Sequence, residues 1–302
     1  MRMDSDLQYK VLQHPMLAST NTHLINLLAS GEPLEEFTVV LTDEQTSGRG
    51  QGTNRWSSQG GKNLTFSTLL LPDLDAREHF FLNMCVSLGI RDTVEKYTDG
   101  VQVKWPNDIY VGEDKICGIL IESSIKGGRI TRCVAGIGLN VNQEEFESWI
   151  PNPTSIRNVT GEETDLTQLL DETMHNLYKY YTLLKQGRRQ EIKQEYLAHL
   201  WRKDLEADYQ DAEGRFTGII RGCDDMGRLQ IERPDGRIST YAFRGVSSPL
   251  FFFFFFPPGG CGGGGGGAQT PPPCPPQRLP TFRTLQTDKK NPGLAAGVSR
   301  LK

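Results

Sequence analysis

The sequence lacks the cysteine patterns that mark a disulfide framework or a zinc site. None of its six cysteines forms a CxxC pair, and no histidine stands at ligand spacing from them. This pattern favours free thiols in a reducing compartment. We therefore expect neither a disulfide bond nor a metal site.

A targeting signal and a membrane-spanning segment are missing as well. The first ten residues, MRMDSDLQYK, contain no apolar core of the kind that signal peptides carry. No segment approaches the roughly 20 apolar residues that cross a bilayer. These absences predict a cytoplasmic protein without a membrane partner.

Positive charge is sparse over most of the chain. The net charge is −4, and six basic residues against one aspartate after residue 246 leave −9 on the residues before that point. Affinity for nucleic acid rests on clustered lysine and arginine. An acidic body therefore argues against nucleic acid as a partner, while a hydrophobic fraction of 37% fits a globular core.

The apolar pattern of residues 1–203 predicts one α+β domain. Apolar residues at helical spacing indicate four helices, and alternating runs joined by tight turns indicate a mixed or antiparallel sheet. The helices are expected between Ser19 and Gly31 and over 76–97, 165–185 and 189–201, and the strands over 37–41, 63–69, 101–105, 109–111, 116–122 and 129–142. We expect the helices to flank the sheet.

Residues 204–246 change in character. Short β runs are broken by turns that end at Gly214, Gly227 and Gly236. Turns spaced about ten residues apart are typical of a small β-barrel or curled sheet. The sequence therefore predicts a second, small β-domain.

Residues 247–302 have a composition that no packed domain shares. They contain six consecutive phenylalanines, 10 of the 32 glycines and 10 of the 17 prolines. Such a segment cannot offset the entropy lost on ordering. We expect a disordered, low-complexity and non-native tail, as a frameshifted gene end would produce. The alternative is a proline-rich ligand for a partner domain.

The segment Gly48–Gly52 is a glycine-rich loop with an arginine inside it. Glycines let successive N–H groups converge on an anion, and Arg49 adds a charge that fits carboxylate or phosphate. The loop matches neither GxGxxG nor GxxxxGK[ST], which argues against a dinucleotide site and a P-loop. An ordinary turn is the alternative.

A second segment, KWPND, is followed by a lysine seven residues after the aspartate. The amide of Asn107 suits an adenine edge, and Trp105 suits stacking on the ring. The alternatives are a strand-ending turn and, for Lys115, a solvated strand end. The later run GIGLN places Gly136 and Gly138 where a flat group could lie on the backbone, unless this strand simply packs closely against a neighbour.

These motifs occur together in a characteristic order. STN, QxxGRG, WxxxGGKNLTFS, KWPND, KIxGILxE and GIGLNVN follow one another from Ser19 to Asn142, within a similarity that covers about Ser19 to Phe243. This combination resembles the biotin–protein ligase family, in its form without an N-terminal DNA-binding domain. The resemblance implies the class II synthetase-like biotin/lipoate ligase fold, with a small C-terminal SH3-like β-domain. That β-domain looks truncated here, because the family continues with a further strand where the phenylalanine run begins.

The resemblance also implies roles for individual residues. Biotin-contacting positions are matched by Ser19, Thr20, Asn21, Gln45, Arg49, Gly50, Gln51, Lys115, Gly118, Gly136 and Gly138, and ATP-side positions by Trp105, Asn107 and Asn140. Lys115 corresponds to the essential lysine between the biotin carboxylate and the α-phosphate. With Lys115, we expect Arg49 and Asp108 to be catalytic, Asp108 by orienting or deprotonating the acceptor amine.

The implied reaction has two steps. The carboxylate of biotin attacks the α-phosphate of MgATP, which gives biotinyl-5′-AMP and pyrophosphate. A lysine of the biotin carboxyl carrier protein of an acyl-CoA carboxylase then attacks the mixed anhydride. Mg²⁺ would be held by ATP oxygens and water rather than by a carboxylate cage. Whether the enzyme forms a homodimer through a sheet edge stays open.

Three alternatives stand beside this interpretation. A lipoate–protein ligase shares the chemistry, but KWPND with GRG favours biotin. A catalytically dead biotin-binding module is countered by the retention of Lys115, and a biotin-sensing repressor needs a helix-turn-helix for which 18 residues before Ser19 are too few. One departure from the family is Gln51, which replaces an arginine and drops a charge that helps to hold the adenylate.

Overall fold

A mixed sheet of eight strands carries the candidate site. The computed structural model describes residues 7–243 and 245–247. The strand order is β1-β2-β3-β8-β7-β6-β5, and β4 pairs with β8. The strands are β1 Val11–Leu17, β2 Val39–Gln45, β3 Leu64–Leu70, β4 Leu74–Asp75, β5 Val101–Lys104, β6 Asp108–Val111, β7 Asp114–Lys126 and β8 Arg129–Leu139. Only β1 and β2 run parallel among these pairs.

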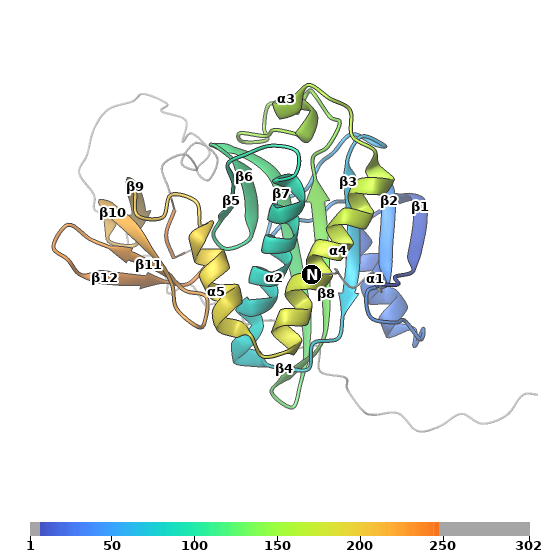
Figure 1. The fold of residues 1–302 in the computed structure, drawn as a ribbon, viewed down its shortest axis with the longest axis horizontal. Coiled ribbons are helices and arrows are strands. Elements are labelled where there is room, and N and C mark those ends of the chain that lie inside the picture. The colour runs from blue at the N-terminus through green and yellow to red at the C-terminus, as the bar shows by residue number, and fades with distance from the viewer. Residues whose placement is uncertain (1–6, 244, 248–302) are drawn as a thin grey trace, which may run out of the picture. The chain divides into compact units, whose positions relative to one another are not determined.

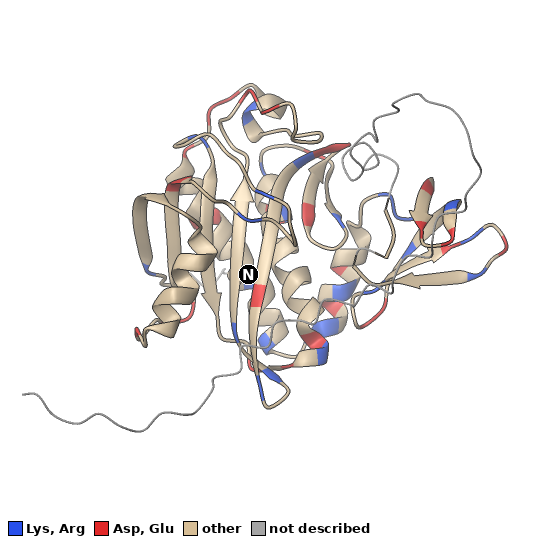
Figure 2. Ribbon diagram, turned by 180° about the vertical axis from the view of Figure 1, so that it is seen from behind, with Lys and Arg blue, Asp and Glu red and all other residues tan. Residues whose placement is uncertain are grey.

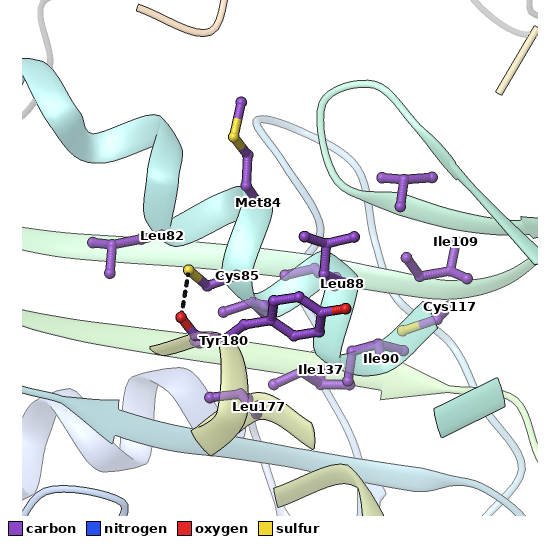
Figure 3. Packing of buried hydrophobic residues seen from close by; sticks show 14 of the residues in the cluster. Leu82, Met84, Cys85, Leu88, Ile90, Ile109, Cys117, Ile137, Leu177 and Tyr180 are labelled. Atoms are coloured by element: carbon purple, nitrogen blue, oxygen red, sulfur yellow. Dashed lines mark hydrogen bonds between the residues drawn. The ribbon is translucent and has the colours of Figure 1, made fainter. Parts of the chain in front are cut away.

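Two long helices cover one face of this sheet (Figure 1). They are α2, His79–Val94, and α4, Leu166–Lys185. A third helix, α5, Arg189–Ala198, lies beside α2. α2 lies between the sheet and its neighbouring helices, so residues on most of its circumference are buried. Figure 3 shows Leu88 and Ile90 of α2 packed with Leu177 of α4 and Ile137 of β8.

Helix α1, Thr20–Ala29, packs on the opposite face of the sheet. Its start is set by Ser19, whose side chain accepts a hydrogen bond from the N–H of Thr22. Leu24 is fully buried and contacts a second, smaller apolar cluster that includes Val40 and Val134. The N-terminal turn of α1 is therefore held directly above the central strands.

A separate antiparallel sheet follows the last helix of the described chain. Its order is β12-β11-β10-β9, with β9 Glu206–Asp211, β10 Gly214–Cys223, β11 Leu229–Glu232 and β12 Ile238–Tyr241. Ser247 forms an isolated antiparallel bridge with Gln210 of β9. The predicted α+β fold, with helices flanking a mixed sheet and a small β-domain, is confirmed.

The structure corrects several element bounds. The predicted strand over 37–41 lies over Val39–Gln45, because Phe37 has a positive φ of 65° and cannot continue it. The predicted helix over 76–97 is a 3₁₀ turn, η1 Ala76–Glu78, followed by α2. β1 and α3, Ile156–Thr160, were not predicted.

The domain boundary between 203 and 204 stays a prediction, and the predicted disordered tail over 247–302 lies, apart from Ser247, outside the described residues. None of the helices within 7–247 combines the length and apolarity needed to cross a membrane.

Candidate active site

Three glycines line the sheet face opposite α2 and α4. Gly118 of β7 pairs with Gly138 of β8, and Gly136 lies on the same face two residues earlier. Their neighbours Cys117 and Ile137 point into the core beneath the helices. These three glycines, the glycine face, leave backbone without side chains on this side of the sheet. Figure 2 shows the sheet from behind, and its central strands carry few charged residues there.

The indole of Trp56 lies on this bare backbone. A Cβ atom added to Gly138 would stand 2.6 Å from Trp56 Nε1, and one added to Gly118 would stand 2.9 Å from Trp56 Cζ3. A side chain at either position would therefore displace the ring. We predicted a flat group above these glycines, but we did not single out Trp56, although it opens the motif WxxxGGKNLTFS.

Trp56 reaches this position through the glycine-rich loop, which folds as a hairpin. The N–H of Trp56 donates to the carbonyl of Gly48 at 3.0 Å, and the N–H of Gly50 donates to that of Asn54 at 2.8 Å. Arg49 and Arg55 form an antiparallel bridge between the two arms. The predicted anion-wrapping loop thus closes on itself in this structure and covers the glycine face, with Gln51 near its tip.

The first turn of α1 brings four predicted biotin-contacting residues together. Ser19, Thr20 and Asn21 are buried, and the N–H of Thr20 donates to Gln45 Oε1 at 2.8 Å. The hydroxyl of Ser67, on β3, lies 2.5 Å from Asn21 Oδ1 and 2.7 Å from Thr20 Oγ1. Sequence reasoning missed Ser67, although it stands within the WxxxGGKNLTFS motif.

Glu122 links the hairpin to the first turn of α1. Its Oε2 atom accepts from Asn21 Nδ2 at 2.8 Å and pairs with Arg49 at 2.7 Å. A Cβ atom on Gly136 would stand 2.9 Å from Asn21 Cγ, so this glycine makes room for the asparagine. Glu122 was not predicted as a site residue, although it ends the motif KIxGILxE.

Two buried polar atoms near Gly138 have no hydrogen-bond partner within the described chain. They are Trp56 Nε1 and the hydroxyl of Thr65, the residue that pairs with Gly138 across β3 and β8. Leaving such a group unsatisfied costs about 1–3 kcal/mol. A ligand with both a donor and an acceptor would relieve this cost.

The predicted catalytic lysine lies at the edge of the same site. The ammonium group of Lys115 is 2.7 Å from a carboxylate oxygen of Asp108, and about a quarter of each side chain is exposed. A Cβ atom on Gly118 would stand 3.4 Å from Lys115 Cε and 2.9 Å from Trp56. Lys115 and Trp56 therefore meet above Gly118.

A second lysine of the KWPND segment is largely buried close by. The Lys104 ammonium lies 4.5 Å from the ring centre of Tyr110 and 4.6 Å from that of Trp201. Burial lowers the pKa of Lys104 to about 8, against the opposing effect of the Asp108 carboxylate. The lysine therefore carries its charge at neutral pH, but loses it in mildly alkaline solution.

The predicted ATP-side residues make hydrogen bonds within the protein. Asn107 Nδ2 donates to the carbonyl of Ile119 and to Asn83, both at 3.2 Å. Asn140 Nδ2 donates to the carbonyl of Thr154 at 2.9 Å. The Trp105 indole donates to the carbonyl of Gly227, in the small sheet, at 2.8 Å. A role in adenine binding stays a prediction for all three residues.

The described residues contain no cluster of three or more His, Cys, Asp or Glu side chains arranged to hold a metal ion.

A cavity of about 450 Å³ lies beside α2 and α5. It is lined by Asp75, Arg77, Glu78, Phe81, Arg189, Gln190, Lys193, Asp225 and Met226. Its cations pair with its carboxylates, as in Arg77 with Asp75 and Lys193 with Asp225. This cavity is not formed by the glycine face.

The fold and this site together define a class of protein. The sequence model of the biotin/lipoate A/B protein ligase family matches residues 14–140, which include the first turn of α1, the hairpin and Lys115.

Individual relatives narrow the class. The bifunctional ligase/repressor BirA of Salmonella typhimurium is 30% identical over 236 residues, which cover 75% of this chain and 70% of that protein. The biotin–[acetyl-CoA-carboxylase] ligase of Paracoccus denitrificans is 27% identical, with 74% of this chain and 95% of that one covered. The biotin protein ligase of Aquifex aeolicus, solved in complex with biotin and ATP, superimposes with a TM-score of 0.66 at 25% identity and covers 79% of this chain and 99% of that chain. The chain belongs to the biotin protein ligase family.

Proposed function

We propose that this protein is a biotin–protein ligase, which makes biotinyl-5′-AMP from biotin and MgATP and transfers biotin to a lysine of a biotin carboxyl carrier protein. The observation that carries the proposal is that Lys115 and Trp56 meet above the backbone of Gly118. A biotin ring that displaced the indole from the glycine face would offer its ureido group to Trp56 Nε1 and to the hydroxyl of Thr65. The name of the Paracoccus relative supports an acyl-CoA carboxylase subunit as the acceptor.

The first step brings two anions together. The carboxylate of biotin and the α-phosphate of ATP repel each other, so a fixed positive charge between them lowers the barrier. Lys115 supplies this charge from the edge of the glycine face, with Arg49 in the covering hairpin as a second cation. Mg²⁺ held by ATP oxygens and water would neutralise part of the phosphate charge.

The ion pair between Lys115 and Asp108 suggests how the second step follows. When the reacting anions draw the ammonium of Lys115 away, the carboxylate of Asp108 loses its partner. It is then able to orient the acceptor lysine and accept its proton, which an amine must lose before it attacks the anhydride. Lys115 thereby serves the first step, and Asp108 serves the second.

The hairpin controls access to the adenylate. Trp56 lies on the backbone of Gly138, so a ring that binds there requires the hairpin to move. The pair between Arg49 and Glu122 ties the hairpin to β7, and partly exposed pairs of this kind contribute about 1 kcal/mol or less. Closure over the adenylate would exclude water and slow its hydrolysis.

In this proposal residues 1–203 form the catalytic domain and residues 204–246 the small domain. A cytoplasmic location fits both ATP as substrate and the free, buried cysteines Cys85, Cys117, Cys133 and Cys223.

The test is ATP–pyrophosphate exchange by the purified protein with biotin or lipoate as the acid. We expect exchange that depends on biotin, followed by biotinylation of an apo carrier domain. Exchange with lipoate alone would assign the chain to the other branch of the family, and biotin binding without exchange would make it a binding module.

A further inference from the structure

We propose that the turn Asp224–Gly227, between β10 and β11, is a positioning element of the active site, because it fixes the indole of Trp105 and with it the KWPND segment. The inference rests on the proposed function. It adds a role for the small sheet, which supplies no residue to the glycine face.

The contact between the turn and the KWPND segment is direct. The Trp105 indole N–H donates to the carbonyl of Gly227 at 2.8 Å, across 122 positions of sequence. Gly227 has a φ of 78°, and a Cβ atom on it would stand 2.7 Å from Phe80 Cβ and closer still to two atoms of the Phe80 ring. Only glycine allows the turn to approach α2 this closely.

The same contact supports the next residue of the segment. Phe80 packs edge-to-face on Tyr196, with ring centres 5.7 Å apart. The fully buried Tyr196 donates its hydroxyl hydrogen to the carbonyl of Pro106 at 2.9 Å. The turn therefore acts on Trp105 directly and on Pro106 through two packed rings. Asn107 and Asp108, the partner of Lys115, follow at once.

Hydrogen bonds of Asp224 hold the turn in its conformation. The Asp224 carboxylate accepts from the N–H groups of Met226 at 3.0 Å and Arg228 at 2.9 Å. It also pairs with the Arg228 side chain at 2.6 Å. At the outer side of the turn Asp225 pairs with Lys193 of α5 at 2.6 Å. The side chain of Asp225 is 86% exposed, so this pair adds little to the stability of the turn.

The small sheet offers a matched control for the key glycine. Gly236, in the turn between β11 and β12, has a φ of 81°, and no atom lies within 4 Å of an added Cβ. Gly227→Ala and Gly236→Ala therefore introduce similar backbone strain into the same sheet, but only the first disturbs Phe80 and Trp105.

The experiment compares these two variants with the wild-type protein. For Gly227→Ala we expect kcat/KM for ATP in pyrophosphate exchange to fall about tenfold or more, with biotin affinity unchanged. We also expect faster amide hydrogen exchange over residues 104–110. Gly236→Ala should match the wild type in all three measurements. Trp105→Phe, which keeps a ring and removes the N–H, serves as a second probe if Gly227→Ala does not fold, and it should lower kcat/KM for ATP in the same direction.

Three results would overturn the inference: wild-type ATP kinetics and amide exchange in Gly227→Ala, equal losses in Gly236→Ala, or, where Gly227→Ala does not fold, wild-type ATP kinetics in Trp105→Phe. Failure of the proposed function has a different signature, since the wild-type protein would then support no exchange at all. The amide-exchange comparison would still decide whether the turn holds the KWPND segment.

Discussion

Trp56 and Gly138 are in direct contact, with the indole ring lying on the glycine backbone so closely that a Cβ atom there would stand 2.6 Å from Nε1. The ring comes from the hairpin and the glycine from β8, and the indole N–H has no hydrogen-bond partner within the described chain. A ligand that uses this backbone must move the ring, and it gains a hydrogen bond if it pairs with the N–H.

This contact predicts a change in tryptophan fluorescence when biotin binds. The environment of Trp56 should change as the hairpin moves, so the emission of the wild-type protein should shift on titration with biotin. Trp56→Phe should abolish most of that signal. The control is Trp149→Phe, because Trp149 is 45% exposed, and this variant should keep the signal. A signal that survives in Trp56→Phe and disappears in Trp149→Phe would contradict the assignment.

The glycine face makes a prediction about biotin affinity. Gly138→Ala places a methyl group on the backbone where a biotin ring would lie once the indole has moved, and overpacking of this kind costs about 1–3 kcal/mol. We expect biotin affinity measured by calorimetry to fall about tenfold or more. In Gly60→Ala the nearest atom to the new methyl group lies 3.4 Å away, on Glu44, and affinity should stay unchanged. Equal affinities in both variants would show that biotin does not use this face.

The pair formed by Lys115 and Asp108 predicts that the two steps respond differently to Asp108→Asn. The amide cannot accept a proton, so transfer to an apo carrier domain should slow by about 10²-fold or more, a typical loss for a general base. Pyrophosphate exchange should change much less, because Lys115 is retained. Single-turnover measurement of each step separates the two effects. Transfer at the wild-type rate would exclude Asp108 as the base.

Lys104 predicts a pH dependence of stability. Its pKa is lowered from 10.5 to about 8 in the folded protein, so above pH 8 the unfolded chain binds more protons at this residue. The free energy of unfolding should therefore rise with pH from about 8 toward 10 through this group. Asp108, Lys115, Arg202 and Glu113 are the charged groups that act on it.

The measurement for this prediction is denaturant unfolding of the wild type and of Lys104→Met between pH 7 and 9.5. Methionine fills similar space without a charge, so the difference in unfolding free energy, wild type minus variant, should grow with pH. A flat difference across the whole range would mean that Lys104 is not desolvated.

Local patterns predicted the elements whose cause is local. The helix after Ser19 and the tight turns between β5, β6, β7 and β8 were predicted because each is specified within a few residues. β1 was missed because VLQHPML contains a proline and no clear alternation, and its strand conformation depends on parallel pairing with β2. The division of the chain at residue 203 stays a prediction.

The site was predictable as a set of motifs but not as a geometry. The motifs pointed to Asn21 and Arg49, but not to Glu122, whose carboxylate joins them across 101 and 73 positions of sequence. The contact between Trp56 and Gly138 and the one between Trp105 and Gly227 arise in the same way. Such contacts depend on how the sheet, the hairpin and the small domain pack, which no local pattern encodes.

Lys115→Ala is the most direct test of the account. We expect ATP–pyrophosphate exchange with biotin to fall about 10²–10³-fold, as for the loss of one group that stabilises transition-state charge, while calorimetry finds biotin binding only modestly weakened. Exchange at the wild-type rate in Lys115→Ala would contradict the account.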